Sequence, residues 1–301
     1  MDKWRTHPVA LEDLDRIDRV LRGWEPTGGC GGTLQAGDLG WKMRFGRQKA
    51  AESLLEWRSP EGGTVAVMCQ NSPSDWWLAI DPSHDRDRTL ADSIADWAME
   101  ENAGASVSID GPGPPAAWRQ AFVERRFEAS PDAWIHLWKP LSIADVVDVP
   151  GVEVTAGNEQ AIADRVAVQT AAFVNSTFTV EKWHAMADGQ SFRPEFDLLA
   201  RDDAGVPVSA ITVWLPGVGK CGMIEPMGTH PDHRQRGHGR RVVLAACGAL
   251  ARAGASGVCV VTPESNAPAI GVYRAVGFRR IGRLSFMVRP ALPAFGNTIL
   301  P

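Results

Sequence analysis

The sequence is poor in tyrosine, which occurs once, at Tyr273, in a chain of 301 residues that contains 12 tryptophans and 10 phenylalanines. It also lacks any run of about 18 apolar residues and any apolar signal region at its start, so we predict neither a membrane span nor secretion. No C-x-x-C pair is present, and scattered cysteines of odd number are typical of a reducing compartment rather than of a disulfide framework or a zinc ribbon. The cysteines are Cys30, Cys69, Cys221, Cys247 and Cys259. We therefore expect a cytoplasmic protein with no membrane partner.

An excess of positive charge is missing as well. The 31 Lys and Arg residues stand against 36 Asp and Glu residues, which gives a formal net charge of -5. Because nucleic-acid-binding surfaces are usually basic, we expect no nucleic-acid partner. With 44% hydrophobic and 22% charged residues, the chain has the composition of a globular protein with a sizeable core, in one domain or two. A monomer and a homodimer are both compatible with this composition.

Strand-like and helix-like segments alternate along the chain. In the second half, helices are predicted at residues 159–173, 179–187, 242–254 and 266–276, with strands before, between and after them. Most of these strands are sequential neighbours, and one strand-helix-strand crossover is present. The pattern predicts an α/β (α+β) fold, in which a mixed, mostly antiparallel twisted sheet is flanked by helices.

The first half repeats this plan in degraded form. Paired strands are predicted at residues 54–57 and 64–69, helices at 89–101 and 116–126, and a closing strand at 132–140. In each half, one proline ends a strand and another proline follows the closing strand. These prolines are Pro82 and Pro140 in the first half and Pro231 and Pro290 in the second, and the two intervals differ in length by one residue. We predict two tandem copies of one fold, residues 1–145 and residues 151–301, joined by a polar, proline-containing segment.

The sharpest local signal is G-T-H-P-D-H-R-Q-R-G-H-G-R-R, residues 228–241, between a predicted strand and an amphipathic helix. Gly237 and Gly239 allow a tight turn and leave backbone N–H groups uncovered at a helix N-terminus, where partial positive charge gathers. Arg234, Arg236 and Arg240 add guanidinium groups suited to phosphate. The combination predicts a cradle for a pyrophosphate.

Other interpretations of this turn are weaker. The dinucleotide fingerprint G-x-G-x-x-G and the P-loop G-x-x-x-x-G-K-[ST] are both absent. His230, His233 and His238 suggest a metal site, but no cysteine or carboxylate with ligand spacing accompanies them, and we predict no metal. Two lesser alternatives stay open for this turn. It could contact the phosphates of a nucleic acid, or it could be a solvated basic turn that only caps the helix.

Two motifs now carry a family resemblance. The segment R-Q-R-G-H-G resembles the R/Q-x-x-G-x-G/A signature of the GNAT N-acetyltransferase superfamily, and H-P-D-H places a proline just before it, as that family does. Downstream, N-x-x-A-I-x-x-Y-x-x-x-G-F, from Asn266 to Phe278, resembles the second signature helix of the family. The resemblance covers residues 152–289. An altered first copy followed by an intact second copy is similar to tandem GNAT enzymes such as mycothiol synthase, without a close match.

The resemblance implies acetyl-coenzyme A as cosubstrate and no metal. Its pyrophosphate would lie on backbone N–H groups of residues 234–240, and its pantetheine arm would run beside the strand that ends at Gly228 and Thr229. Asn266 would meet the arm from the neighbouring strand. The implied cofactor contacts are Met227, Gly228, Thr229, Arg234, Gln235, Arg236, Gly237, His238, Gly239, Arg240 and Asn266.

The resemblance also implies catalytic roles for Tyr273 and Glu225. Tyr273 stands at the family position of the general acid that protonates the departing thiolate, and a phenol with a pKa near 10 is protonated at neutral pH. Glu225 resembles the base that takes the proton of the attacking amine, directly or through a water. An alternative for Glu225 is that it only positions the substrate or pairs with an arginine.

The first half serves as an internal control. Aligning Pro82 with Pro231 places Asp85, Arg88 and Leu90 at the positions of Arg234, Gly237 and Gly239. Side chains would then fill the phosphate space, and Phe122 would stand opposite Tyr273 without a hydroxyl. We therefore predict that the first copy is non-catalytic and serves as a scaffold, a cleft wall or a dimer surface.

The acceptor is predicted less sharply. Candidate substrate contacts in residues 173–196 are Phe173, Asn175, Trp183 and His184. We expect an N-acetyltransferase that acts on a primary amine of a small molecule, with a cationic amino sugar, antibiotic or polyamine favoured by the acidic net charge. A non-catalytic acyl-coenzyme A sensor and an enzyme acting on a protein or peptide amine are the alternatives.

Overall fold

The structure is a computed structural model that describes residues 4–27, 29–30, 32, 34–101, 106–108, 116–284 and 286–289. Its α-helices are α1 Leu14–Trp24, α2 Ala36–Lys42, α3 Arg47–Glu52, α4 Arg88–Glu101, α5 Ala116–Glu124, α6 Glu159–Ala172, α7 Val180–Ala187, α8 His238–Arg252 and α9 Ala267–Ala275. Short 3-10 turns are η1 Leu11–Asp13, η2 Met43–Phe45, η3 Pro82–His84, η4 Ile143–Asp145, η5 Pro194–Phe196 and η6 Pro231–His233. No described helix is long and apolar enough to cross a membrane.

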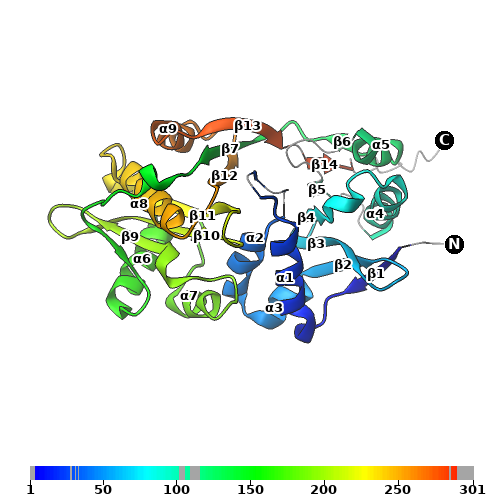
Figure 1. Cartoon of the computed structure of the whole chain (residues 1–301), viewed down its shortest axis with the longest axis horizontal. Coiled ribbons are helices and arrows are strands. Elements are labelled where there is room, and N and C mark those ends of the chain that lie inside the picture. The colour runs from blue at the N-terminus through cyan, green and yellow to red at the C-terminus, as the bar shows by residue number, and fades with distance from the viewer. Residues whose placement is uncertain are drawn as a thin grey trace, which may run out of the picture.

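The strands form two sheets that lie side by side along the long axis of the molecule (Figure 1). One has the order β1-β2-β3-β4-β5-β14-β6, with β1 Arg5–Pro8, β2 Leu54–Arg58, β3 Thr64–Ser72, β4 Asp75–Ile80, β5 Ser106–Ser108, β14 Phe286–Val288 and β6 Glu128–Ala129. The other has the order β8-β9-β10-β11-β12-β7-β13, with β8 Val152–Val154, β9 Asp197–Arg201, β10 Pro207–Trp214, β11 Cys221–Thr229, β12 Gly257–Pro263, β7 Trp134–Pro140 and β13 Arg279–Leu284. Strand for strand the two orders correspond, which confirms two copies of one mostly antiparallel plan.

The two copies exchange one strand. β7 pairs along its whole length with β12, from Gly257 opposite Pro140 to Pro263 opposite Trp134, and its other edge pairs with β13. In return β14 takes the equivalent place between β5 and β6 in the first sheet. The prediction that residues 132–140 close the sheet of the first copy was therefore wrong, because an alternating pattern fixes a strand and its buried face but not the sheet that it joins. The division into residues 1–145 and 151–301 stays a prediction about chain segments.

Helices pack on both faces of the C-terminal sheet because successive strand residues point to opposite sides. Leu198 and Ala200 of β9 lie in one core cluster with Val242 and Val243 of α8. Leu199, between them, packs with Ala161 of α6 in another cluster. The first copy has the same arrangement, with α4 on one face of its sheet and α1, α2 and α3 on the other.

Helix α2 of the first copy packs against the second copy. Gly40 faces Trp214 of β10, and a Cβ at Gly40 would lie 2.5 Å from the Cζ3 of that ring. A Cβ at Gly37 would lie 2.6 Å from the Cε of Met223 in β11. Glycine at these two positions lets α2 approach β10 and β11 closely, and this approach shapes the cavity described next.

Candidate active site

Strands β11 and β12 separate part-way along their length. They pair in parallel at only three positions, Cys221 with Gly257, Gly222 with Val258 and Met223 with Cys259, although β11 continues to Thr229 and β12 to Pro263. Beyond Met223 the facing edges diverge, and residues 224–227 and 260–263 line a cavity of about 530 Å³. An unpaired strand edge offers backbone N–H and C=O groups that an extended ligand can bind as an additional strand would.

A bulge in β11 places Glu225 at the mouth of this divergence. Ile211 of β10 pairs with Met227 and Val213 pairs with Ile224, so two residues of β11, Glu225 and Pro226, lie opposite one residue of β10. Bulges re-aim side chains and are frequent beside active sites. The Glu225 carbonyl accepts a hydrogen bond of 2.6 Å from the indole N–H of Trp214, and its side chain lines the cavity.

The predicted turn precedes helix α8 as expected. Gly237 is the N-cap residue with φ +85°, a left-handed conformation that glycine adopts without steric cost, and Gln235 has φ +61°. No side chain caps this helix. The N–H groups of the first turn therefore point out of a helix N-terminus without a side-chain acceptor, and this is a favourable place for a phosphate.

The arginines of the turn differ in what they do. The Arg234 guanidinium donates to the backbone carbonyls of Thr229 at 3.2 Å and Ala172 at 3.0 Å, so it braces the end of β11 against the end of α6. Arg236 and Arg240 are exposed, whereas His238 is buried at the start of α8. The Arg236 and Arg240 side chains are therefore more accessible to an anion than that of Arg234, which is held by backbone carbonyls.

The end of β11 is closely packed against neighbouring elements. The Thr229 and Ser209 hydroxyls are 2.9 Å apart. A Cβ at Gly228 would lie 2.7 Å from the Cβ of Ala172 and 3.0 Å from the ring of Phe173, so only glycine fits here. Met227 and Phe173 line the cavity beside this contact.

Tyr273 and Asn266 of the second motif both line the same cavity. The Tyr273 side chain is 4% exposed, and its ring centroid is 5.4 Å from that of Phe278. Asn266 caps α9 by accepting the Ala269 N–H, and its amide donates to the Thr262 hydroxyl at 3.3 Å. Asn266 thus joins the end of β12 to the start of α9.

Glu225 and Tyr273 affect one another electrostatically. Burial raises the pKa of Glu225 to about 7, and the nearby Arg44 guanidinium opposes this rise. Burial also raises the pKa of Tyr273 above its usual value, with a further increase from the Glu225 carboxylate. A carboxyl that titrates near neutral pH can accept a proton, and a phenol with a raised pKa stays protonated, so the pair has the states that an acid and a base need.

The opposite wall of the cavity comes from the first copy, a role that the sequence left open, although it identified none of the residues that form this wall. Its lining residues lie at the start of α2, on α2 and after it, and on β3, β4 and β7, and no motif marks them. They are Gln35, Asp38, Trp41, Lys42, Arg44, Asn71, Asp75, Trp77 and Trp134. The cavity is therefore shared between the two copies.

Charged groups of both signs meet on this wall. Asp38 is 9% exposed and accepts the Gln35 N–H at 2.7 Å; burial raises the pKa of Asp38, and Glu225 raises it further. The Arg44 guanidinium lies over the rings of Trp41 and Phe45, at 4.1 and 4.3 Å from their centroids, and burial lowers the pKa of Arg44 to about 10. Burial also lowers the pKa of Lys42. The local charge is mixed, so the acidic net charge is no guide to the acceptor.

Of the four predicted substrate contacts, the cavity is lined by Phe173 alone. Trp183 is buried and its indole donates to Asp197 at 2.8 Å, within a core network that includes the fully buried Arg165. Asn175 is an exposed turn residue with φ +63°, and His184 lies 3.5 Å from Glu159 on the surface. The structure thus gives Trp183 a role in the core.

Among the described residues of the first copy, the corresponding helix start is not open as it is in the second copy. Asp87 caps the start of α4, where its carboxylate accepts the N–H groups of Thr89 and Leu90 at 2.9 and 3.2 Å. Leu90 is fully buried, and the Trp118 indole donates to the Asp85 carbonyl at 2.6 Å. The corresponding turn of the first copy is thus filled by the protein's own groups.

Phe122 and Tyr273 occupy matching places. Phe122 packs on Phe127 with ring centroids 5.2 Å apart, as Tyr273 packs on Phe278. The first copy therefore retains the aromatic pair without the hydroxyl.

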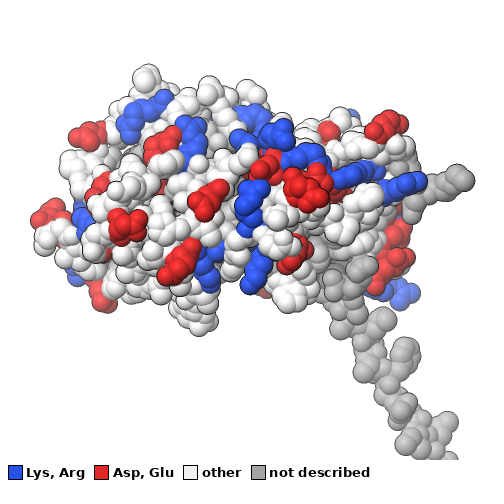
Figure 2. Space-filling view, turned by 90° about the horizontal axis from the view of Figure 1, so that it is seen from below, with Lys and Arg blue, Asp and Glu red and all other residues white. Residues whose placement is uncertain are grey.

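The surface charge is interspersed. On the face shown in Figure 2, Lys and Arg side chains alternate with Asp and Glu side chains, and the described residues of this face form no continuous basic stripe.

The three histidines of the turn lie in a row. The ring centroids of His230 and His233 are 5.5 Å apart, and those of His233 and His238 are 6.3 Å apart. In the described part of the chain, the one cluster with metal-ligand spacing consists of Cys30, His136 and Cys259, and none of the three histidines of the turn belongs to it.

Comparison with known proteins agrees with this geometry. Residues 168–278, which span the divergence of β11 and β12, the turn and α9, match the acetyltransferase (GNAT) family. The chain is also 26% identical over 210 residues to a mycothiol acetyltransferase of Clavibacter michiganensis, with 67% of this chain and 68% of that protein covered. Residues 168–278 form a GNAT acetyltransferase domain, and the chain is an acyltransferase. GNAT enzymes use acetyl-coenzyme A as cosubstrate.

Solved structures extend the likeness over both copies. A tandem GNAT protein from the clavulanic acid biosynthesis pathway aligns with 97% of this chain and 99% of its own, with a TM-score of 0.59 and 18% identity. A GNAT-family acetyltransferase from Colwellia psychrerythraea aligns with 95% of this chain and 99% of its own, with a TM-score of 0.60 and 13% identity. At these identities the likeness concerns the fold, and it confirms the tandem GNAT architecture.

Proposed function

We propose that this GNAT enzyme transfers the acetyl group of acetyl-coenzyme A to a primary amine of a small molecule, by direct attack in a ternary complex. The observation that carries the proposal is that Glu225 and Tyr273 line one cavity at the point where β11 and β12 diverge. A cavity of about 530 Å³ has the size of a small-molecule site.

The cofactor is proposed to lie in the divergence and over the turn. The pantetheine arm would bind the open edge of β11, at Met227, Gly228 and Thr229, with Asn266 on the facing side. The pyrophosphate would bind the N–H groups at the start of α8, helped by Arg236 and Arg240. The remaining backbone contacts proposed for it are Arg234, Gln235, Gly237, His238 and Gly239.

In the proposed reaction, the amine nitrogen attacks the thioester carbonyl, so that an N–C bond forms and the C–S bond breaks. Glu225 accepts the proton that the amine loses, directly or through a water. Tyr273 donates its phenolic proton to the departing sulfur. Product release and proton exchange with solvent restore both groups. With a pKa of about 7, Glu225 is largely available as a base just above neutral pH.

The acceptor is proposed to bind against the wall of the first copy. Trp41, Trp77 and Phe173 provide aromatic surface, and Asp38 and Arg44 provide charge of both signs. This wall favours a small molecule that carries its amine next to other polar groups, rather than the purely cationic acceptor suggested by net charge. The first copy is proposed to serve as a cavity wall without binding a cofactor of its own.

A screen of amines tests this function. Purified protein is mixed with acetyl-coenzyme A and each amine, the release of free thiol is followed, and the product is identified by mass. At least one small amine is expected to gain one acetyl group, with release lost in Tyr273→Phe. Cofactor binding without release for any amine would favour the sensor alternative, and acetylation confined to peptides would favour the macromolecular one.

A further inference from the structure

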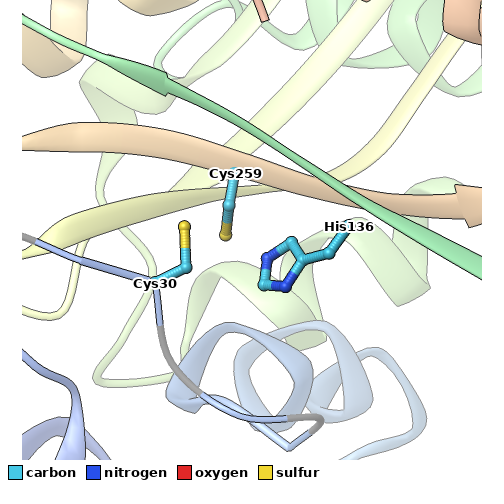
Figure 3. A group of neighbouring side chains, drawn as sticks. All are labelled: Cys30, His136 and Cys259. Carbon is cyan, nitrogen blue, oxygen red and sulfur yellow. The ribbon is translucent and has the colours of Figure 1, made fainter. Parts of the chain in front are cut away.

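Four side chains from four separate segments converge behind the cavity. Cys30 lies between α1 and α2, Cys221 opens β11, Cys259 lies in β12, and His136 lies in the exchanged strand β7. The ligand atoms of Cys30, Cys259 and His136 all lie within 4.8 Å of one another, and Figure 3 shows the three side chains turned toward a common point. The Sγ of Cys221 is 3.3 Å from the Sγ of Cys30. All four residues are buried.

The imidazole of His136 has no partner in the described structure. It is 1% exposed, and neither Nδ1 nor Nε2 has a hydrogen-bond partner among the described residues. Burying a polar ring without partners is costly, so such a group calls for an explanation. A metal ion bound at the point between the ring and the thiols would supply the missing partner.

The arrangement fits a tetrahedral thiolate and imidazole site. With zinc–sulfur distances near 2.3 Å, tetrahedral geometry separates two sulfur ligands by about 3.8 Å. The Cys30 and Cys221 sulfurs, 3.3 Å apart, are somewhat closer than this, and the ligand atoms of Cys30, Cys259 and His136 lie within 4.8 Å of one another. Side-chain adjustment, chiefly of Cys221, would complete the tetrahedral geometry, and three cysteines with one histidine are a common ligand set of structural zinc.

We propose that Cys30, Cys221, Cys259 and His136 form a structural zinc site. The three thiols release their protons to solvent as Zn²⁺ binds, and the neutral imidazole supplies the fourth ligand. No short sequence motif marks this site, since its ligands are brought together by the strand exchange and by the packing of the first copy on β11. The inference does not depend on the acetyltransferase mechanism.

The site would fasten the cavity wall to the divergent strands. Cys259 belongs to the last pair before β11 and β12 separate, and Cys221 to the first. The segment after Cys30 leads to Gln35 and Asp38, which line the cavity. The isolated bridge between Thr27 and Lys220 already ties this segment to the start of β11. One ion would therefore join the first copy, the exchanged strand and both strands of the divergence.

Metal content tests the proposal directly. Protein prepared with a reducing agent and without chelator is expected to hold one zinc per chain, measured by plasma mass spectrometry. Cys30→Ser and Cys259→Ser are expected to lose most of it. Cys247→Ser, in the buried face of α8, is the matched control and keeps the metal. The thermal midpoint of the wild type and of the control falls on chelation, whereas that of Cys30→Ser does not.

Cobalt gives a second readout that needs no variant. Chelator-treated wild-type protein titrated with Co²⁺ is expected to develop sulfur-to-cobalt charge-transfer bands and the visible bands of a tetrahedral ion, saturating at one ion per chain. Absence of these bands, together with less than about one zinc in ten chains, would overturn the proposal even if the cysteine variants fail to fold. A Cys30–Cys221 disulfide in protein that never binds metal would also overturn the proposal, because that bond would consume two of the four ligands.

Discussion

Replacing Tyr273 by phenylalanine removes one oxygen atom from the centre of the proposed mechanism and leaves the ring in place. The ring is 4% exposed and packs on Phe278 at a centroid distance of 5.4 Å, contacts that phenylalanine keeps. The free energy of unfolding is therefore expected to change by less than about 1.5 kcal/mol. Loss of a positioned general acid is expected to lower kcat by about 10²-fold or more, which corresponds to at least about 2.7 kcal/mol of transition-state stabilisation.

The assay is steady-state acetylation of the acceptor found by the amine screen, with calorimetric binding of acetyl-coenzyme A as the control for folding. The dissociation constant of the cofactor is expected to stay within about threefold of the wild-type value, because the proposed cofactor contacts lie on β11, the turn and Asn266. Since burial and Glu225 both raise the pKa of Tyr273, wild-type activity is expected to show no fall between about pH 7 and pH 9. A variant with unchanged kcat would refute the role of the hydroxyl, and one that no longer binds cofactor would show that the ring position has been misread.

Three further outcomes follow from the geometry. Because Glu225 must be deprotonated to act as a base and its pKa is about 7, kcat/KM should rise with pH through about 7, which is the acid limb of the pH profile. Glu225→Gln should lower activity and abolish this limb, and an unchanged limb would show that another group causes the rise. Arg44→Met removes the charge that holds the pKa of Glu225 down, so the limb should move to higher pH, and a shift to lower pH would contradict the pairing. Gly40→Ala places a Cβ 2.5 Å from the ring of Trp214, so it should lower the free energy of unfolding by about 1–3 kcal/mol and raise the KM of the acceptor. The matched Gly23→Ala in α1, with open space around it, should leave that free energy unchanged or raise it by up to about 1 kcal/mol in chemical denaturation, and a loss of stability there would contradict this reasoning.

Sequence reasoning succeeded where the site is contiguous in the chain. The tight turn at Gly237, the open start of α8 and the position of Tyr273 on α9 all follow from short motifs whose residues fix their own backbone geometry. The contrast with the first copy was also predictable, because Asp85, Arg88 and Leu90 replace the residues that such a turn requires. Local rules act over a few residues, and these features depend on little else.

The remainder depends on contacts between distant segments. The cavity wall at Asp38 and Arg44 arises because Gly37 and Gly40 let α2 approach Trp214, and no local pattern connects these positions. The exchange of β7 and β14 is invisible to strand periodicity. The thiol and imidazole cluster likewise gathers Cys30 and His136 with two strands far along the chain, so a search for closely spaced cysteines finds nothing.

Calorimetric titration with acetyl-coenzyme A tests the central claim most directly, because that claim places one working cofactor site in the second copy and none in the first. The account predicts one molecule bound per chain, with binding weakened at least tenfold when Gly237 and Gly239 are both replaced by alanine and unchanged by Asp87→Ala. Two molecules per chain, or a single site that survives the double glycine replacement, would contradict it.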